Sequence, residues 1–154
     1  ANTNRVCDYE FVSKLQIDEI PNLEETEILI KCREIDSKIT KISNYIHTSY
    51  ITINGKLNGE IYVLNLDDIY YVENRVFAYV EKNVYEVNYK LQELSEMLSR
   101  TSFIQIARTI ILNINKIEKV STLVNGRISA VLVNSERMII TRVYAHAFKQ
   151  KLNG

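Results

Sequence analysis

Glycine is scarce in this 154-residue sequence, and its four copies are Gly55, Gly59, Gly126 and Gly154. That spacing fits neither the GxGxxG fingerprint of dinucleotide-binding folds nor the GxxxxGK[ST] phosphate loop, so nucleotide binding by those two routes is excluded. The sequence also lacks HExxH and the GxSxG nucleophile elbow. These absences predict a protein that is not an enzyme.

Cysteine is equally sparse, with Cys7 and Cys32 standing far apart and outside any CxxC pair or Cys/His cluster. This excludes a zinc site of the usual spacing and the disulfide framework of small secreted domains, and we expect no metal and no cofactor. The first residues lack the apolar core of a signal peptide, and no apolar run approaches the ~18 residues of a membrane span. The expected location is the cytoplasm, without direct membrane insertion.

Residues suited to acid–base chemistry are few and scattered. His47 and His146 are distant in sequence, and each is expected on a surface or helix face rather than in a catalytic site. The pair Asp67-Asp68 precedes an apolar strand pattern, which favours a capped turn over a metal or acid pair.

The net charge of zero conceals a division along the chain. Residues 1–46 carry six basic and nine acidic side chains, and residues 47–98 carry four and eight. Residues 99–154 carry nine basic side chains and only two acidic ones, which indicates a polyanionic partner. The alternative is that the acidic and basic parts fold together and neutralise each other.

The first 50 residues predict a small strand and helix extension. Residues 5–11 and 27–33 are patterned as two short strands around an acidic loop that contains the single proline. Four isoleucines then recur at helical spacing, which predicts a helix with one apolar face, either core or a partner-helix surface. They are Ile35, Ile39, Ile42 and Ile46.

From residue 51 onward the pattern is mainly β. Period-2 strands alternate with turn signals at Asn54-Gly55, Asn58-Gly59 and Asn125-Gly126, the last being the strongest hairpin signal. Helical spacing predicts a short helix at 89–99 and a terminal helix at 141–152.

Polar residues in the basic third lie at the ends of predicted β elements. Arg108-Thr109 interrupts a long apolar run, and Thr141-Arg142 lies where the last strand gives way to the terminal helix. Arginine forks and threonine hydroxyls suit phosphate oxygens or guanine edges, and a helix N-terminus favours anions. The alternative for each arginine is a solvated charge or a salt bridge to Glu73 or Glu136.

Residues 59–152 resemble a LytTR domain, the DNA-binding module of many bacterial response regulators. The segments that carry the resemblance are LDDIYYVE at 66–73, YEV at 85–87, LQEL at 91–94, FIQIARTIILN at 103–113, NKI at 115–117 and ITRVY at 140–144. The resemblance implies an elongated, mainly antiparallel β domain with short helices, whose loops enter successive major grooves of repeated sites in double-stranded DNA.

The resemblance also implies which residues contact DNA. One segment is the loop at Asn74, Arg75 and Val76, and a second is the turn at Ala107, Arg108 and Thr109. A third is the start of the C-terminal helix, at Arg142 and Val143. Ala107 and Val143 replace a His and an Arg that are common in the family, which predicts altered base specificity.

The 50-residue extension is too short for a receiver domain, so we expect a stand-alone regulator, residues 51–154 being the DNA-binding domain. The extension is expected to dimerise or sense, giving a homodimer, and by analogy a membrane protein is a possible regulatory partner. The alternative function is a β-rich module that binds a protein or ligand and has no role on DNA.

Overall fold

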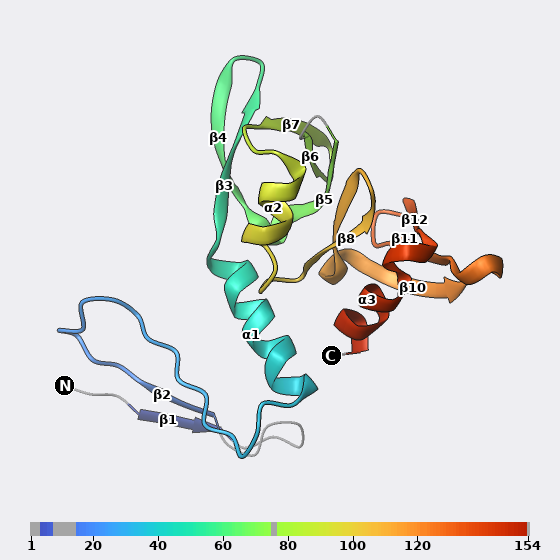
Figure 1. The fold of residues 1–154 in the computed structure, drawn as a ribbon. Helices are drawn as coiled ribbons and strands as arrows, with labels where there is room; N and C mark the ends of the chain where they lie inside the picture. Colours follow the sequence, from blue (N-terminus) through green and yellow to red (C-terminus); the bar gives the residue numbers. More distant parts are fainter. Residues whose placement is uncertain (1–3, 8–14, 75–76, 154) are drawn as a thin grey trace. The chain divides into compact units, whose positions relative to one another are not determined.

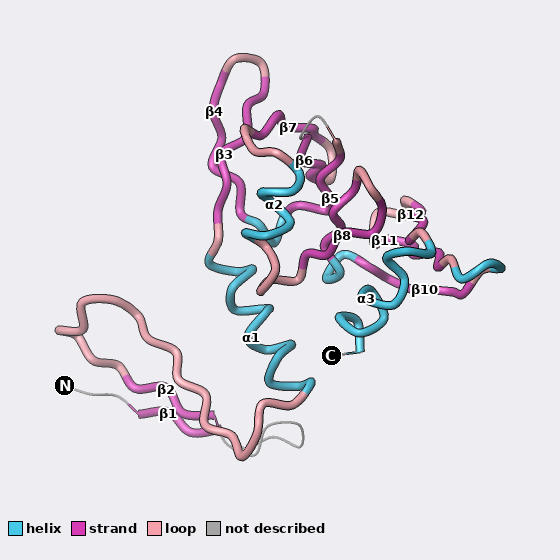
Figure 2. The backbone as a smooth tube through the Cα atoms, in the orientation of Figure 1, coloured by secondary structure: helices cyan, strands magenta, loops and turns pink. Residues whose placement is uncertain are grey.

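A computed structural model describes residues 4–7, 15–74 and 77–153 of the chain. The chain divides into two compact units, residues 1–33 and residues 34–154. Figure 1 shows their elements in chain colours, and Figure 2 shows that strands dominate the second unit. Within the described ranges no helix is both long enough and apolar enough to cross a lipid bilayer.

The first unit contains a two-stranded antiparallel pair, β1 (Asn4–Cys7) with β2 (Leu15–Asp18). The predicted strand at 27–33 is wrong, because this segment is irregular and its Ile28 and Leu29 are exposed. A strand requires a neighbouring strand for its backbone N–H and C=O groups, and the apolar residues of this segment do not supply one. Residues 8–11 of the other predicted strand lie outside the described residues.

The second unit begins with helix α1 (Ser37–Tyr50), as the isoleucine spacing predicts. Its N-cap is Asp36, whose carboxylate accepts a hydrogen bond from Ile39 N at 3.0 Å. The C-terminal part of α1 is fixed by buried Thr48, whose hydroxyl accepts a hydrogen bond from Ser102 N at 2.9 Å. Ser102 in turn donates to the Asn113 side chain at 2.8 Å, so a buried polar chain joins α1 to the sheet.

A seven-stranded antiparallel sheet follows, in the spatial order β4-β3-β7-β6-β5-β9-β8. Its strands are β3 (Thr52–Leu57), β4 (Glu60–Asn65), β5 (Ile69–Glu73), β6 (Phe77–Val80), β7 (Asn83–Val87), β8 (Phe103–Ala107) and β9 (Ile110–Asn113). The predicted turn at Asn54-Gly55 is wrong, because both residues lie inside β3. Gly55 is needed there for close packing, since an added Cβ would lie 2.7 Å from the Cβ of Tyr85.

A smaller sheet has the order β10-β11-β12. Its strands are β10 (Ile117–Thr122), β11 (Ile128–Leu132) and β12 (Arg137–Ile140). The Asn125-Gly126 hairpin between β10 and β11 is confirmed, and both turn residues have positive φ. Helix α3 (Arg142–Asn153) follows β12, close to its predicted bounds, while the earlier short helix α2 covers Leu91–Met97.

Two hydrophobic cores lie on opposite faces of the large sheet, because adjacent strand residues point to opposite sides. On β9, Ile111 belongs to the core that also contains Leu94 and Leu98 from the α2 region. Its neighbour Leu112 belongs to the core that contains Phe148 of α3 and residues of the small sheet. The β8–β9 hairpin is therefore packed from both sides, which fixes the position of the turn between them.

Candidate nucleic-acid interface

Two of the three predicted DNA-contacting segments are joined by a backbone hydrogen bond. Asn74 N donates to Thr109 O at 2.8 Å, which continues the β5–β9 pairing one residue past Glu73 and Ile110. Asn74 is exposed and Thr109 is half-buried. Residues 35 positions apart in sequence thus lie side by side where two adjacent strands end.

Arg108 and Thr109 form the two-residue turn between β8 and β9, and the Arg108 side chain is exposed. The turn is held from within by Gln105 of β8. Its side-chain amide donates to Ala107 O at 3.1 Å and to Arg108 O at 3.3 Å. The Arg108 guanidinium is therefore exposed to solvent, while hydrogen bonds from Gln105 of β8 hold the backbone of the turn.

The third segment is tied to the same hairpin. Thr141 N donates to Ile106 O at 2.9 Å, directly before α3 begins at Arg142. The amide of Gln105 also lies 3.3 Å from the hydroxyl of Tyr144, in the first turn of α3. The β8–β9 turn and the start of α3 therefore share one hydrogen-bonded network.

Arg142 is exposed, and its methylene groups lie against the β10–β11 turn. A Cβ added to Gly126 would lie 3.3 Å from Arg142 Cγ. A glycine at position 126 therefore leaves room for the methylene groups of Arg142. The next residue, Val143, is 85% exposed. The first turn of α3 contains no acidic residue, so its N-terminal N–H groups and the guanidinium favour an anion together.

Glu136, one of the two acidic residues considered as salt-bridge partners for the arginines, forms hydrogen bonds with other side chains. Its carboxylate accepts hydrogen bonds from the Tyr71 hydroxyl at 2.8 Å and from the Asn134 amide at 2.8 Å. Burial, followed by the hydrogen bond to Glu136, raises the pKa of Tyr71 above its usual range. Tyr71 also stacks on Tyr79, with ring centroids 4.4 Å apart. This cluster joins β5 to the turn between β11 and β12.

The structure brings Asn74, Arg108, Thr109 and Arg142 onto one connected set of backbone segments. The predicted contacts Arg75 and Val76 lie outside the described residues. His47 and His146 are exposed, and Asp67 and Asp68 form part of a 3-10 turn. In the described part of the chain, no group of three or more His, Cys, Asp or Glu side chains is arranged to hold a metal ion.

Sequence reasoning overlooked the positioning residues of this site. The contact between Gln105 and Tyr144 spans 39 residues, and neither residue stands out by spacing. The one available signal was a glutamine in the apolar run Phe103–Leu112, where a polar side chain needs a partner.

The family model of the LytTr DNA-binding domain matches residues 59–153. The chain belongs to this family. The LytTR match covers both the β8–β9 turn and the start of α3, and the mainly antiparallel β fold that the sequence predicts is confirmed.

Two known proteins are similar to this chain, one in sequence and one in structure. The sensory transduction protein LytT of Enterococcus faecalis is 32% identical over 105 residues, which are 66% of this chain and 43% of that protein. The chain thus spans less than half the length of this curated relative. A solved LytTr DNA-binding domain from Bacillus cereus has a TM-score of 0.62 and 23% identity, covering 67% of this chain and 97% of that one.

Proposed function

We propose that this protein is a sequence-specific, DNA-binding transcriptional regulator of the LytTR type. The observation that carries the proposal is the hydrogen-bonded set of segments around the β8–β9 turn, which presents Arg108 and Arg142 to solvent. The excess of basic residues after position 98 supports a polyanionic partner. The LytTR family and its printed DNA-binding description support duplex DNA as that partner.

The proposed contacts are assigned by chemistry and position. Arg108 and Arg142 supply bidentate forks for phosphate or guanine, in successive major grooves of repeated sites. Thr109 supplies a hydroxyl and Asn74 supplies an amide at the same turn. Arg75 is the remaining proposed contact, and its assignment rests on the sequence alone. Because Ala107 and Val143 are apolar, we propose a base preference that differs from that of relatives with polar residues there.

We further propose a homodimer that forms through the N-terminal region, residues 1–50. Helix α1 is preceded by Ile35, which is 80% exposed, and carries Ile42, which is 41% exposed. Ile39 and Ile46 are half-buried on the same stripe. A symmetric partner would bury these apolar groups, and paired protomers fit repeated DNA sites. Sedimentation showing monomers at micromolar concentration, free and on DNA, would contradict this.

The location and the control of the protein are also proposals. A cytoplasmic protein fits a DNA-binding domain, and a membrane protein is the regulatory partner that we propose by analogy.

The experiment that tests the function measures binding to duplex DNA from upstream of the protein's own coding sequence, across a range of salt concentrations. Affinity should fall with a log–log slope of about −0.9 for each phosphate that the protein neutralises. DNase footprinting on the same fragment should show protected repeats at a spacing near one helical turn. Absence of salt-sensitive binding would favour the alternative, a β-rich module that binds a protein or ligand.

A further inference from the structure

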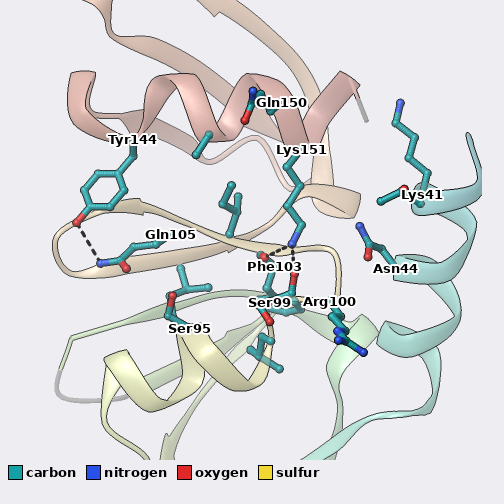
Figure 3. A pocket seen from close by; sticks show the side chains of 15 residues that line it. Lys41, Asn44, Ser95, Ser99, Arg100, Phe103, Gln105, Tyr144, Gln150 and Lys151 are labelled. Atoms are coloured by element: carbon teal, nitrogen blue, oxygen red, sulfur yellow. Dashed lines mark hydrogen bonds between the residues drawn. The ribbon is translucent and has the colours of Figure 1, made fainter. Parts of the chain in front are cut away.

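A groove of about 600 Å³ lies between α1, the α2–β8 connection and α3. Figure 3 shows Lys41 and Asn44 of α1 on one side of it and Tyr144, Gln150 and Lys151 of α3 on another. Its volume is in the range of small-molecule sites.

The interior of the groove is mostly apolar. Ile104, which is half-buried, and Ala147, which is exposed, present apolar surface to the groove. Leu98, Phe103 and Ile111 also line it, but at most 2% of each is exposed, so they form its packed base within the core of the large sheet. Such a lining selects a ligand with a hydrocarbon or aromatic body.

Lys151 gives one part of the groove a cationic group that still has a hydrogen to donate. Its ammonium donates to Phe103 O at 2.8 Å and to Ser99 O at 3.1 Å. Both acceptors are neutral carbonyls, and an ammonium has three hydrogens, so one N–H remains for another acceptor. Partial burial lowers the pKa of Lys151 to about 8, which leaves it charged at neutral pH.

The other charged side chains of the groove have the same sign. Lys41 and Arg100 line it with Lys151, and within the described ranges none of the lining side chains is acidic. A partly desolvated ammonium without a counter-charge is costly, and a bound anion would offset that cost. The groove is therefore complementary to a molecule with one anionic head and an apolar body.

The groove also reaches the network that supports the candidate DNA interface. Gln105 and Tyr144 line it, and Figure 3 shows their hydrogen bond beside the groove. The amide of Gln105 that lies 3.3 Å from the Tyr144 hydroxyl also donates to Arg108 O at 3.3 Å. A molecule in the groove would contact the residues that hold the Arg108 turn and the start of α3.

We propose that this groove is an effector site for a small amphipathic carboxylate, whose head binds Lys151 and whose body lies against Ile104 and Ala147, and that its occupancy strengthens DNA binding. The binding step stands on the groove alone. The regulatory step rests on the proposed DNA-binding function. Strengthening is expected because contacts from a bound molecule would favour the arrangement in which Gln105 and Tyr144 hold the Arg108 turn, and that arrangement is the one proposed to bind DNA.

The binding step is tested by titrating the full chain with octanoate and following amide ¹H–¹⁵N signals. Octanoate should give saturable shifts at groove residues, and octan-1-ol, which lacks the charge, should bind about tenfold or more weakly. Lys151→Met keeps an apolar stem and should weaken octanoate binding by a similar factor. The matched control Lys149→Met changes an exposed lysine of α3 outside the groove and should leave the affinity unchanged.

A second pair of variants keeps the test decisive if Lys151→Met is unstable. Ala147 is an exposed residue of α3 that lines the groove, so Ala147→Phe fills it without disturbing the core. Octanoate binding should be lost in Ala147→Phe and retained in His146→Phe. His146 is the neighbouring residue, and it is exposed and lies outside the groove. No saturable binding, or equal binding by octanoate and octan-1-ol, would overturn the proposal.

The regulatory step is tested by measuring DNA affinity with and without saturating octanoate. We expect affinity to rise by about fivefold or more, and DNA to raise octanoate affinity by the same factor, as linkage requires. Octanoate binding with unchanged or weaker DNA affinity would overturn the regulatory step. If octanoate binds as described but no duplex binds at any salt concentration, the groove stands and the proposed DNA-binding function fails.

Discussion

The backbone N–H of Asn74 donates to the carbonyl oxygen of Thr109 over 2.8 Å, so the β5–β6 loop begins beside the β8–β9 turn. The bond holds two loops, separate in sequence, side by side where β5 and β9 meet. Thr141 N joins the start of α3 to the same hairpin through Ile106 O, at 2.9 Å. A set of loops that is ordered before binding loses less conformational entropy on DNA than independent loops would.

Gln105 is predicted to be a positioning residue for these loops. Gln105→Met keeps the side-chain length but removes the donors to Arg108 O and Tyr144, and should weaken duplex binding by about fivefold. Fluorescence anisotropy measures the affinity, and chemical denaturation checks that the free energy of unfolding changes by less than about 1 kcal/mol. Gln92→Met, at an exposed site on α2, is the control. Equal losses of affinity in both variants would contradict the assignment.

Thr48 is predicted to anchor α1 to the sheet. Thr48→Val preserves shape but leaves the buried N–H of Ser102 without its acceptor, which should lower the free energy of unfolding by about 1–3 kcal/mol. Urea denaturation measures the change. Ser49→Ala removes a comparable hydroxyl bond at an exposed site on the same helix and should cost much less. A Thr48 variant as stable as the Ser49 variant would refute this role.

Gly55 is predicted to be required by packing rather than by a turn. The added methyl in Gly55→Ala would lie 2.6 Å from Leu64 Cδ1 and 2.7 Å from Tyr85 Cβ, so strands β3, β4 and β7 must shift. Overpacking of this kind costs about 1–3 kcal/mol. Thermal denaturation should show a lower Tm than for Asn54→Ala, the exposed neighbour on the same strand. An unchanged Tm would mean that the site can expand freely.

The sequence predicted the fold where local chemistry decides it. The Asn125-Gly126 turn needs two residues of positive φ, and this pair supplies them cheaply. Asn54-Gly55 carries the same letters but lies within a strand, because β3 pairs there with β4 and β7. Its glycine is needed because Tyr85 and Leu64 approach too closely for any side chain. The segment at 27–33 is rich in apolar residues, as strands often are, but it is irregular. In both places the structure depends on which segments pair in the folded chain, and a local sequence pattern does not contain that information.

In the candidate site, too, the sequence predicted what depends on local patterns and did not predict what depends on tertiary contacts. Arg108-Thr109 and Thr141-Arg142 could be singled out because polar residues interrupt apolar runs. Their connection through Gln105 and Tyr144 could not, because a hydrogen bond across 39 residues leaves no local pattern. The family resemblance supplied the expected contacts, and the structure supplied the framework behind them.

Lys151 predicts a specific pH dependence of stability. Burial lowers its folded-state pKa to about 8, below the ordinary value of 10.5, so between these values the unfolded chain binds more protons at this site. The free energy of unfolding contributed by Lys151 should therefore rise from about pH 8 toward pH 10. The measurement is the difference in urea-denaturation free energy between the wild type and Lys151→Met, in which the contribution of Tyr71 cancels. A flat or falling difference would contradict the burial of this ammonium.

The central claim, that Arg108 and Arg142 contact DNA, is tested by their alanine variants. A phosphate contact should lower affinity on all sequences and reduce the magnitude of the salt slope by about 1. A base contact should cost about 1–3 kcal/mol on the footprinted site and little on scrambled DNA. Lys56→Ala removes an exposed charge on β3, well away from β8 and β9 in the strand order, and should change neither quantity.

The most direct measurement is the affinity of Arg108→Ala, Arg142→Ala and Lys56→Ala for the footprinted and scrambled duplexes at two salt concentrations. The account predicts that both arginine variants lose affinity, by one of the two signatures above, while Lys56→Ala binds like the wild type. Wild-type affinity in both arginine variants, or equal losses in all three, would contradict it.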